Sequence, residues 1–87
     1  MWSVKFDRKA FKELQRLGTA EQRRVQRYID ERLLTIDNPR QLGSPLSGTL
    51  SGLWRYRVGD MRIIAQIDDG KLVILVVAIG TRGEIYR

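Results

Sequence analysis

The 87-residue chain contains no cysteine and no histidine. Without cysteine it cannot form a disulfide, a thiolate metal site or a thiolate nucleophile. Without histidine it lacks the most common general base and the most common metal ligand. Acyl transfer and metal-assisted hydrolysis are therefore poorly supported. The pair Asp68-Asp69 is the remaining metal candidate, but Asp69-Gly70 is typical of a tight turn, and we expect neither a metal nor a cofactor.

Long hydrophobic runs are also missing. The longest one, Leu72–Ile79, has eight residues, whereas a membrane-spanning helix needs about 20. The opening segment Met1–Phe6 has neither the apolar stretch nor the cleavage-site pattern of a signal peptide. We therefore expect a cytoplasmic protein that does not bind membranes.

Positive charge is in excess. The chain has 16 Lys and Arg residues against 10 Asp and Glu residues, a formal charge of +6. Most of the basic residues are arginines, whose planar guanidinium matches phosphate oxygens better than the ammonium of lysine does. This balance favours a polyanionic partner, either a nucleic acid or an acidic protein segment. The alternative is that the charge only keeps a small domain soluble.

The first half of the chain has the pattern of one strand and two helices. Residues 2–6 alternate apolar and polar side chains, which indicates a half-buried strand. Asp7 is a suitable N-cap for a first helix that Gly18 would end. Thr19–Gln22 has the pattern of a capping box that opens a second helix, and Asn38-Pro39 would end it. Helical spacing predicts two apolar stripes, Ala10, Phe11, Leu14 and Leu17 followed by Val25, Ile29, Leu33 and Ile36.

The second half has the pattern of a β-sheet. Residues 40–52 predict a long loop, and strands over 53–58 and 61–67 would form a hairpin about Gly59-Asp60. A turn at Asp69-Gly70 would lead into a strand over 71–79 that is apolar on both faces, as in a central strand. Gly80 would break this strand, and Glu84–Tyr86 could form a short terminal one.

These elements predict a single domain over residues 1–87 of the α+β class. The N-terminal strand and the αα-hairpin would pack on one face of a twisted, mainly antiparallel sheet of four or five strands. Trp54, Tyr56 and Val58 would point into the core between helices and sheet. A chain of this length buries only about 60% of its unfolded surface, so we expect a modest stability margin.

Three arginines are predicted to share the opposite face of the sheet. Arg55 and Arg57 alternate with the core residues of their strand, and the hairpin would set Arg57 opposite Arg62. Arg82 and Tyr86, near the end of the chain, could reach the rim of this face. Like charges opposed across a sheet repel each other, and a bound anion would relieve that repulsion. The alternative is an ordinary solvated surface.

The chemistry open to such a site is anion stabilisation, with Tyr86 as a proton donor, proton acceptor or stacking surface. RNA suits these groups, because its 2′-hydroxyl is an internal nucleophile beside the phosphate. The residues alone therefore indicate a protein directed at RNA or phosphate.

A family resemblance makes the prediction more specific. Gly48–Ile64, which includes the run Trp-Arg-Tyr-Arg-Val-Gly-Asp-Met-Arg, resembles the signature of the RelE/ParE toxin superfamily. Ile79–Tyr86 is similar to the closing motif of that superfamily. The opening strand, the helix start at Asp7–Ala10 and the segment Asp37–Pro39 also match, so the resemblance covers essentially the whole chain.

The resemblance implies a toxin of a type II toxin–antitoxin system that cleaves mRNA in the ribosomal A site. The 2′-hydroxyl would attack the phosphate and leave a 2′,3′-cyclic phosphate and a 5′-hydroxyl. Arg62 would stabilise the phosphate in the transition state, and Arg82 would neutralise the leaving oxygen or an adjacent phosphate. Tyr86 would orient or help deprotonate the 2′-hydroxyl, or stack on a base. The implied partners are a cognate antitoxin, the ribosome and mRNA.

The chain departs from the RelE pattern at two places. Arg55 and Arg57 match positions that are lysines in the best-known pattern, and Thr81 stands where many relatives have histidine. Arginine stays charged and cannot easily act as a general base, so electrostatics alone or Tyr86 would have to replace a basic lysine. Two alternatives remain: a ParE-like toxin that inhibits DNA gyrase by binding, and a catalytically weak RNA-binding homologue.

Overall fold

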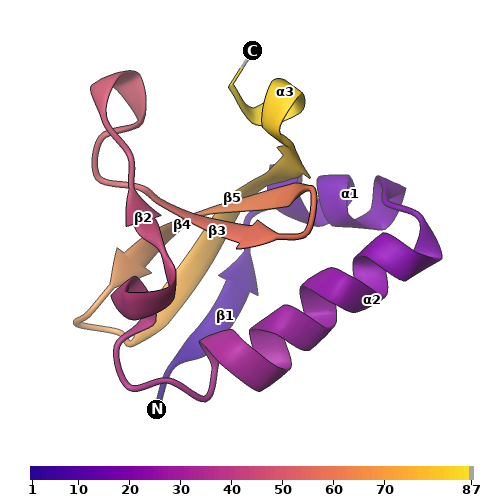
Figure 1. Cartoon of the computed structure of the whole chain (residues 1–87). Coiled ribbons are helices and arrows are strands. Elements are labelled where there is room, and N and C mark those ends of the chain that lie inside the picture. The colour runs from indigo at the N-terminus through magenta and orange to yellow at the C-terminus, as the bar shows by residue number, and fades with distance from the viewer. Residues whose placement is uncertain (87) are drawn as a thin grey trace.

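The computed structural model describes residues 1–86, which form a five-stranded sheet with two helices packed on one side (Figure 1). This arrangement confirms the predicted α+β class. The N-terminal elements are β1 (Ser3–Phe6), α1 (Arg8–Arg16), α2 (Thr19–Tyr28), the π-helical η1 (Ile29–Leu33) and the 3₁₀ segment η2 (Pro39–Leu42). The others are β2 (Ser44–Pro45), the 3₁₀ segment η3 (Gly48–Leu50), β3 (Trp54–Val58), β4 (Met61–Asp68), β5 (Val73–Thr81) and α3 (Arg82–Ile85).

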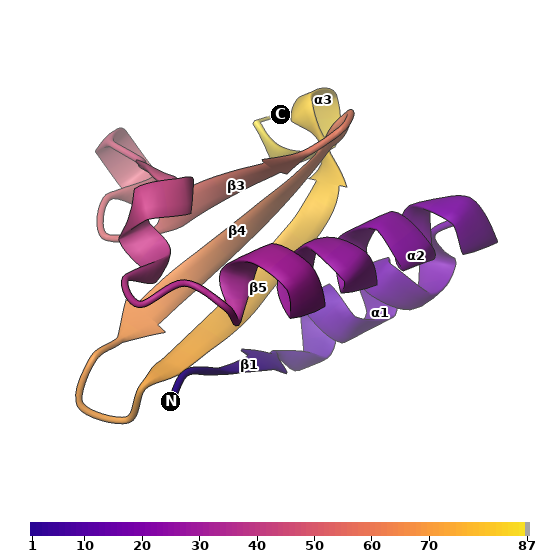
Figure 2. The ribbon, with the colours of Figure 1, turned by 60° about the horizontal axis from the view of Figure 1, so that its bottom comes forward.

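The strands lie in the order β1-β5-β4-β3-β2. β1 runs parallel to β5, and the other neighbouring strands are antiparallel, so the sheet is mainly antiparallel as predicted. Arg57 pairs with Arg62 and Val58 with Met61, which confirms the predicted register about Gly59-Asp60. Figure 2 shows both helices on the same side of the twisted sheet.

The core lies between this helical hairpin and the sheet. The helices contribute Ala10, Val25, Ile29 and Leu33, all nearly inaccessible to solvent. The sheet contributes Tyr56, Val58, Met61, Ile63, Ala65, Ile74, Val76 and Ile79. Trp54 is half-buried against this cluster, in agreement with its assignment to the core. Phe11 is 49% exposed, so the predicted apolar stripe of the first helix is wrong at that position.

The two helix starts use different caps. The Asp7 carboxylate accepts a hydrogen bond from the Ala10 amide at 2.8 Å, which confirms the predicted N-cap. The capping box predicted at Thr19 does not form. Gly18 is the N-cap of α2 instead, and no side chain accepts a capping hydrogen bond there. Instead, the Gln22 side chain donates to the carbonyls of Gln15 and Leu17 at 3.2 and 3.0 Å. Gln22 thereby joins the start of α2 to the end of α1.

The second helix ends before Asn38-Pro39, contrary to prediction. After Tyr28 the helix widens into η1, and the Leu34 amide donates to the Ile29 carbonyl at 2.9 Å. The following segment returns to the sheet because the Tyr56 hydroxyl donates to the Pro39 carbonyl at 2.9 Å. A long-range contact with a buried tyrosine thus holds the chain against the sheet at Pro39, after the helix has ended.

The last strand also ends differently from its prediction. β5 begins at Val73 rather than at residue 71 and continues through Gly80 to Thr81. Glu84–Tyr86 forms no strand, because α3 begins at Arg82 with Thr81 as its N-cap. The Thr81 hydroxyl accepts from the Glu84 amide at 3.4 Å, and the Glu84 carboxylate accepts from the Thr81 amide at 2.7 Å. This reciprocal capping box favours a helical turn over a strand.

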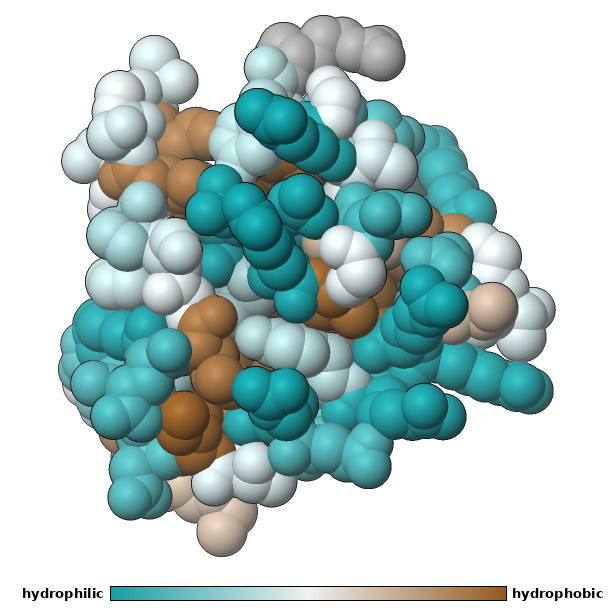
Figure 3. All heavy atoms as spheres, viewed as in Figure 1, coloured by the Kyte–Doolittle hydropathy of each residue, from teal (hydrophilic) through white to brown (hydrophobic). Residues whose placement is uncertain are grey.

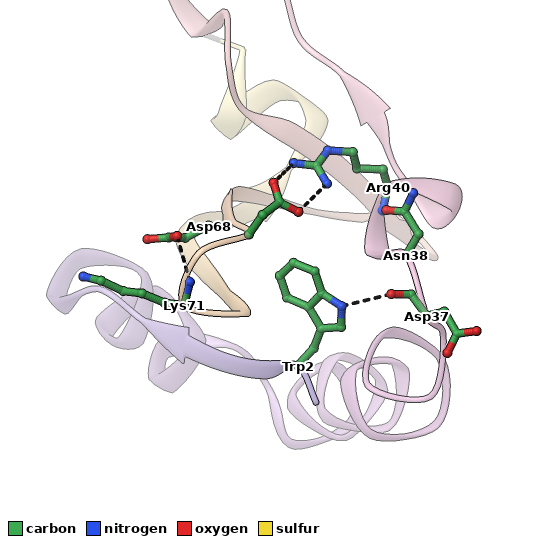
Figure 4. Close-up of polar contacts among 7 residues, drawn as sticks. Trp2, Asp37, Asn38, Arg40, Asp68 and Lys71 are labelled. Atoms are coloured by element: carbon green, nitrogen blue, oxygen red, sulfur yellow. Dashed lines mark hydrogen bonds and ion pairs between the residues drawn. The ribbon is translucent and has the colours of Figure 1, made fainter.

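The predicted loop over 40–52 contains most of η2 together with β2 and η3, and the segment that leads into it is fastened to the β4–β5 turn and to the start of β1 (Figure 4). The Arg40 guanidinium donates to both oxygens of Asp69 at 3.0 and 2.6 Å and lies 5.7 Å from the centre of the Trp54 ring. The Trp2 indole donates to the Asp37 carbonyl at 2.9 Å. Within residues 1–86, none of the helices is long and apolar enough to span a membrane.

Candidate functional site

The predicted arginine face consists of Arg55, Arg57 and Arg62 on the side of the β3–β4 hairpin away from the core. Arg55 pairs with Ile64, and Arg57 pairs with Arg62. Ile64 is 2% exposed but lies outside the cluster that the helices cover, which places it on this other side. Among residues 1–86, no ion pair engages any of the three arginines. The register thus brings unneutralised like charges together, which costs free energy unless an anion is present.

Arg62 is held at the turned end of this hairpin. Its Nη1 donates to the carbonyl of Gly59 at 3.3 Å and to that of Met61 at 3.1 Å. Gly59 has φ +60°, a conformation that favours glycine and that closes the tight turn. Two carbonyls therefore orient one nitrogen of the guanidinium, and the side chain remains partly exposed to a ligand.

Gly80 lies beside Arg62 on the neighbouring strand. A Cβ atom at Gly80 would lie 3.2 Å from the Glu84 Cβ and 3.3 Å from its Oε1, so the missing side chain lets α3 fold back on β5. A glycine inside a strand is often a site of close backbone approach. That signal was present in the sequence, although a strand break was the wrong interpretation of it.

Arg82 and Tyr86 are both exposed; Arg82 is the first residue of α3, and Tyr86 follows the last one. Thr81 pairs with Met61, so the chain enters α3 next to the start of β4, where Arg62 lies. The Tyr86 amide donates to the Arg82 carbonyl at 3.0 Å, and residues four apart lie on the same side of a helical turn. The fold therefore brings Arg82 and Tyr86 to the Arg62 end of the sheet.

Arg55 has a feature that the sequence did not indicate. Its Nε is the one buried side-chain nitrogen or oxygen within residues 1–86 that lacks a hydrogen-bond partner. Arg55 and Arg57 also line a hollow together with Tyr28 and Arg32 of the second helix and η1. The predicted arginine face is therefore not separate from the helices, because β3 lies near the edge of the twisted sheet. Helical periodicity gave no indication that Arg32 lies across from this strand.

The acidic pair Asp68-Asp69 makes structural contacts at the β4–β5 turn. The Asp68 carboxylate accepts from the Lys71 amide at 3.1 Å, while Asp69 pairs with Arg40 (Figure 4). The hydrogen bond from Arg40 lowers the pKa of Asp69, and burial opposes this only in part. The described residues contain no group of three acidic side chains that could hold a metal ion.

The chemistry of the site follows from these groups. Arginines keep their charge at any working pH and present several N–H donors in one plane. They can bind phosphate and stabilise negative charge that develops in a transition state. The phenol of Tyr86 adds the one hydroxyl that could exchange a proton within this set.

Comparison with known proteins identifies the class to which this fold and site belong. A family model described as the ParE toxin of the type II toxin–antitoxin system parDE matches residues 4–86. The chain therefore belongs to this toxin family, within the RelE/ParE superfamily that its motifs resemble.

Individual relatives agree with this membership. Toxin RelE of Mycobacterium tuberculosis is 40% identical over 52 residues, which are 60% of this chain and 54% of the relative. The chain thus aligns with about half the length of that curated relative. The structure is similar to the toxin–antitoxin complex RelBE2 from Mycobacterium tuberculosis, with a TM-score of 0.84, 25% identity and coverage of 93% and 98% of the two chains. It is also similar to the archaeal RelE–RelB complex from Pyrococcus horikoshii, with a TM-score of 0.70, 30% identity and coverage of 94% and 96%.

Proposed function

We propose that this toxin is a ribosome-dependent endoribonuclease that cleaves mRNA in the A site and thereby inhibits translation. The observation that carries the proposal is the cross-strand pair of Arg57 and Arg62. This pair has no carboxylate partner within residues 1–86 and lies at the end of the sheet to which β5 brings Arg82 and Tyr86. An acidic protein segment would also pair with these arginines, but the presence of Tyr86, which can orient a 2′-hydroxyl, favours the nuclease.

The proposed reaction uses the RNA as its own nucleophile. The 2′-hydroxyl attacks the adjacent phosphorus and the bond to the 5′-oxygen breaks, giving a 2′,3′-cyclic phosphate and a 5′-hydroxyl. Arg62 stabilises the additional negative charge on the phosphate oxygens, and Arg82 neutralises the leaving oxygen or a neighbouring phosphate. Arg55 and Arg57 hold the RNA backbone, and Tyr86 orients the 2′-hydroxyl. The proton of the 2′-hydroxyl passes to water, and the leaving 5′-oxygen takes up a proton from water.

The proposed partner in the resting state is an antitoxin. The structures of relatives from Mycobacterium tuberculosis and Pyrococcus horikoshii are toxin–antitoxin complexes. An acidic antitoxin segment would complement the formal charge of +6 and compete with RNA for the same arginines. Binding of the antitoxin would keep the toxin inactive in the cytoplasm.

Primer extension on a reporter mRNA tests the nuclease. After brief induction, the intact protein should produce defined cuts in translated frames. Arg62→Ala should abolish them or reduce them by roughly 10²-fold or more, the usual effect of removing one transition-state donor. Tyr86→Phe should weaken them, whereas Arg8→Ala, a charge change on the exposed start of α1, should leave them intact. Growth arrest without cuts, unchanged by Arg62→Ala, would contradict the nuclease.

The second candidate is inhibition of DNA gyrase by binding, which the match of residues 4–86 to a ParE toxin model favours. A gyrase supercoiling assay with purified toxin separates the two candidates. Inhibition of supercoiling that survives Arg62→Ala would support the gyrase candidate. Binding of RNA without cuts and without gyrase inhibition would instead support a catalytically weak homologue.

A further inference from the structure

A second basic region lies where α2 and η1 face the outer edge of β3. It consists of two adjoining hollows of about 510 and 470 Å³. Both are lined by Tyr28, Arg32 and Arg57. The first hollow adds Leu42, Ser44 and Arg55, and the second adds Arg24, Arg27 and Glu31 together with the start of the β3–β4 turn. We call this continuous depression the helix–edge groove.

The sheet leaves this groove open. β2 pairs with Trp54 and Arg55, and among the strands that residues 1–86 form, none lies on the outer side of β3 from Tyr56 onward. At the other end of the groove, a Cβ atom at Gly59 would lie 3.2 Å from the Arg24 Nη1, which places this guanidinium against the hairpin turn. The groove therefore extends from β2 to the β3–β4 turn along the second helix.

Charge in the groove is strongly one-sided. Five arginines line it against one carboxylate, that of Glu31. Glu31 pairs with Arg27 at 3.7 Å, and both side chains are more than half exposed, so this pair is weak and easily exchanged. In Figure 3, strongly hydrophilic side chains gather over the middle of the face that β3 crosses. A multivalent anion would remove the repulsion among these arginines.

The shape and chemistry favour a sugar–phosphate backbone over an acidic peptide. Apart from the ring of Tyr28, the described lining residues with apolar side chains are Leu42 and Val58, one in each hollow, so a peptide would find few of the apolar pockets in which protein partners usually anchor. Arg32 lies 6.0 Å from the centre of the Tyr28 ring, and this pair offers flat surfaces on which a base can stack. Burial raises the pKa of Tyr28, so its ring stays neutral beside the phosphates.

The groove is continuous with the arginine face. Arg57 lines both hollows and also pairs with Arg62 across the hairpin. Arg55, a residue of the first hollow, adds a further guanidinium on the same strand. We propose that the helix–edge groove binds the backbone of a second RNA segment, which passes over the open edge of β3. The proposal that the bound polyanion is RNA rests on the proposed function. The proposal that the groove binds an anion does not.

The test compares two double variants of equal charge. Arg27→Gln with Arg32→Gln removes two groove arginines, and Arg8→Gln with Arg16→Gln removes two exposed arginines of α1. Each full-length protein is titrated against a labelled, 2′-O-methylated single-stranded RNA, which it cannot cleave, at several KCl concentrations. Each lost phosphate contact should reduce the slope of log K against log salt by about 0.7.

The expected result is a slope reduced by about 1.4 and affinity weakened roughly tenfold in the groove variant, with little change in the α1 variant. Equal losses of RNA affinity in both variants, or no loss in either, would overturn the proposal that the groove binds RNA. Binding of poly-glutamate as tight as that of RNA, with the same dependence on Arg27 and Arg32, would make the groove a protein-docking surface. The groove and the nuclease can fail separately, because Arg62, whose Arg62→Ala variant tests the nuclease, is not a residue of the groove. If the intact protein does not cleave mRNA but still binds RNA through the groove, only the proposed nuclease is wrong.

Discussion

The two faces of the β3–β4 hairpin differ in what their side chains contact. On one face, Tyr56 and Ile63 are fully buried beneath the helices. On the other, Arg57 and Arg62 are opposed across the same register with no ion pair within residues 1–86. Alternation along a strand allows one pair of strands to supply stability on one side and anion binding on the other. Substitutions on the two faces should therefore have opposite effects on folding and on ligand binding.

The largest effect is expected on the core face. Ile63 is fully buried, and Ile63→Ala should lower the free energy of unfolding by about 2 to 5 kcal/mol because it leaves a cavity. Urea denaturation measures this change. RNA affinity of the folded fraction should be unaffected, and a variant that kept its stability while losing affinity would contradict the separation of the two faces.

The second effect concerns Tyr56 at alkaline pH. Burial raises the pKa of its hydroxyl to about 12, with a further increase from Tyr28 and a small opposing effect from Arg40. The unfolded chain loses this proton near pH 10, so the contribution of Tyr56 is complete below pH 10 and is lost between about pH 10 and 12. The loss should be roughly 2 to 3 kcal/mol.

Thermal or urea unfolding across this pH range, compared with Tyr56→Phe, measures that loss. The variant lacks the hydroxyl that donates to Pro39, so it should start less stable by about 1 kcal/mol. It should then show a shallower decline than the intact protein, and Tyr28 accounts for part of what remains. Parallel declines in both proteins would mean that the Tyr56 hydroxyl is not shielded by the core.

The smallest effect on stability is expected on the arginine face. Arg57→Gln removes one of two opposed like charges, so at low salt it should stabilise the fold by about 0.2 to 1 kcal/mol. The gain should shrink at high salt, where exposed charges are screened. The same variant should bind RNA more weakly at low salt. A destabilised Arg57→Gln protein would show that the arginine contributes to packing rather than to anion binding.

Local patterns predicted some features correctly where the relevant partners are close in sequence. Asp7 caps the helix that it precedes, and the Gly59-Asp60 turn sets the register of the hairpin. The same kind of pattern failed at Thr19, because Gln22 instead bonds to carbonyls at the end of α1. At Thr81 and Glu84 a complete capping box forms, although it was not predicted there from the sequence. This capping box makes a helix of a segment that was predicted to be a strand.

The candidate site was predictable only in part. Strand alternation correctly set Arg55, Arg57 and Arg62 on one face, since period 2 and a two-residue turn suffice for that assignment. The roles of these residues, and those of Arg82 and Tyr86, remain predictions for the cleavage assay. The helix–edge groove had no sequence signature, because its arginines are spread over two elements that the fold alone brings together.

The sequence by itself determined the α+β class, the hairpin register, the excess of arginine and the family motifs, since each depends on composition or on neighbours within a few residues. The tertiary structure decided the course of the chain after the second helix and which arginines share a groove. These outcomes depend on contacts between distant segments, such as the hydrogen bond from Tyr56 to Pro39. Burial and chain packing, which no local pattern encodes, select among the alternatives that the sequence left open.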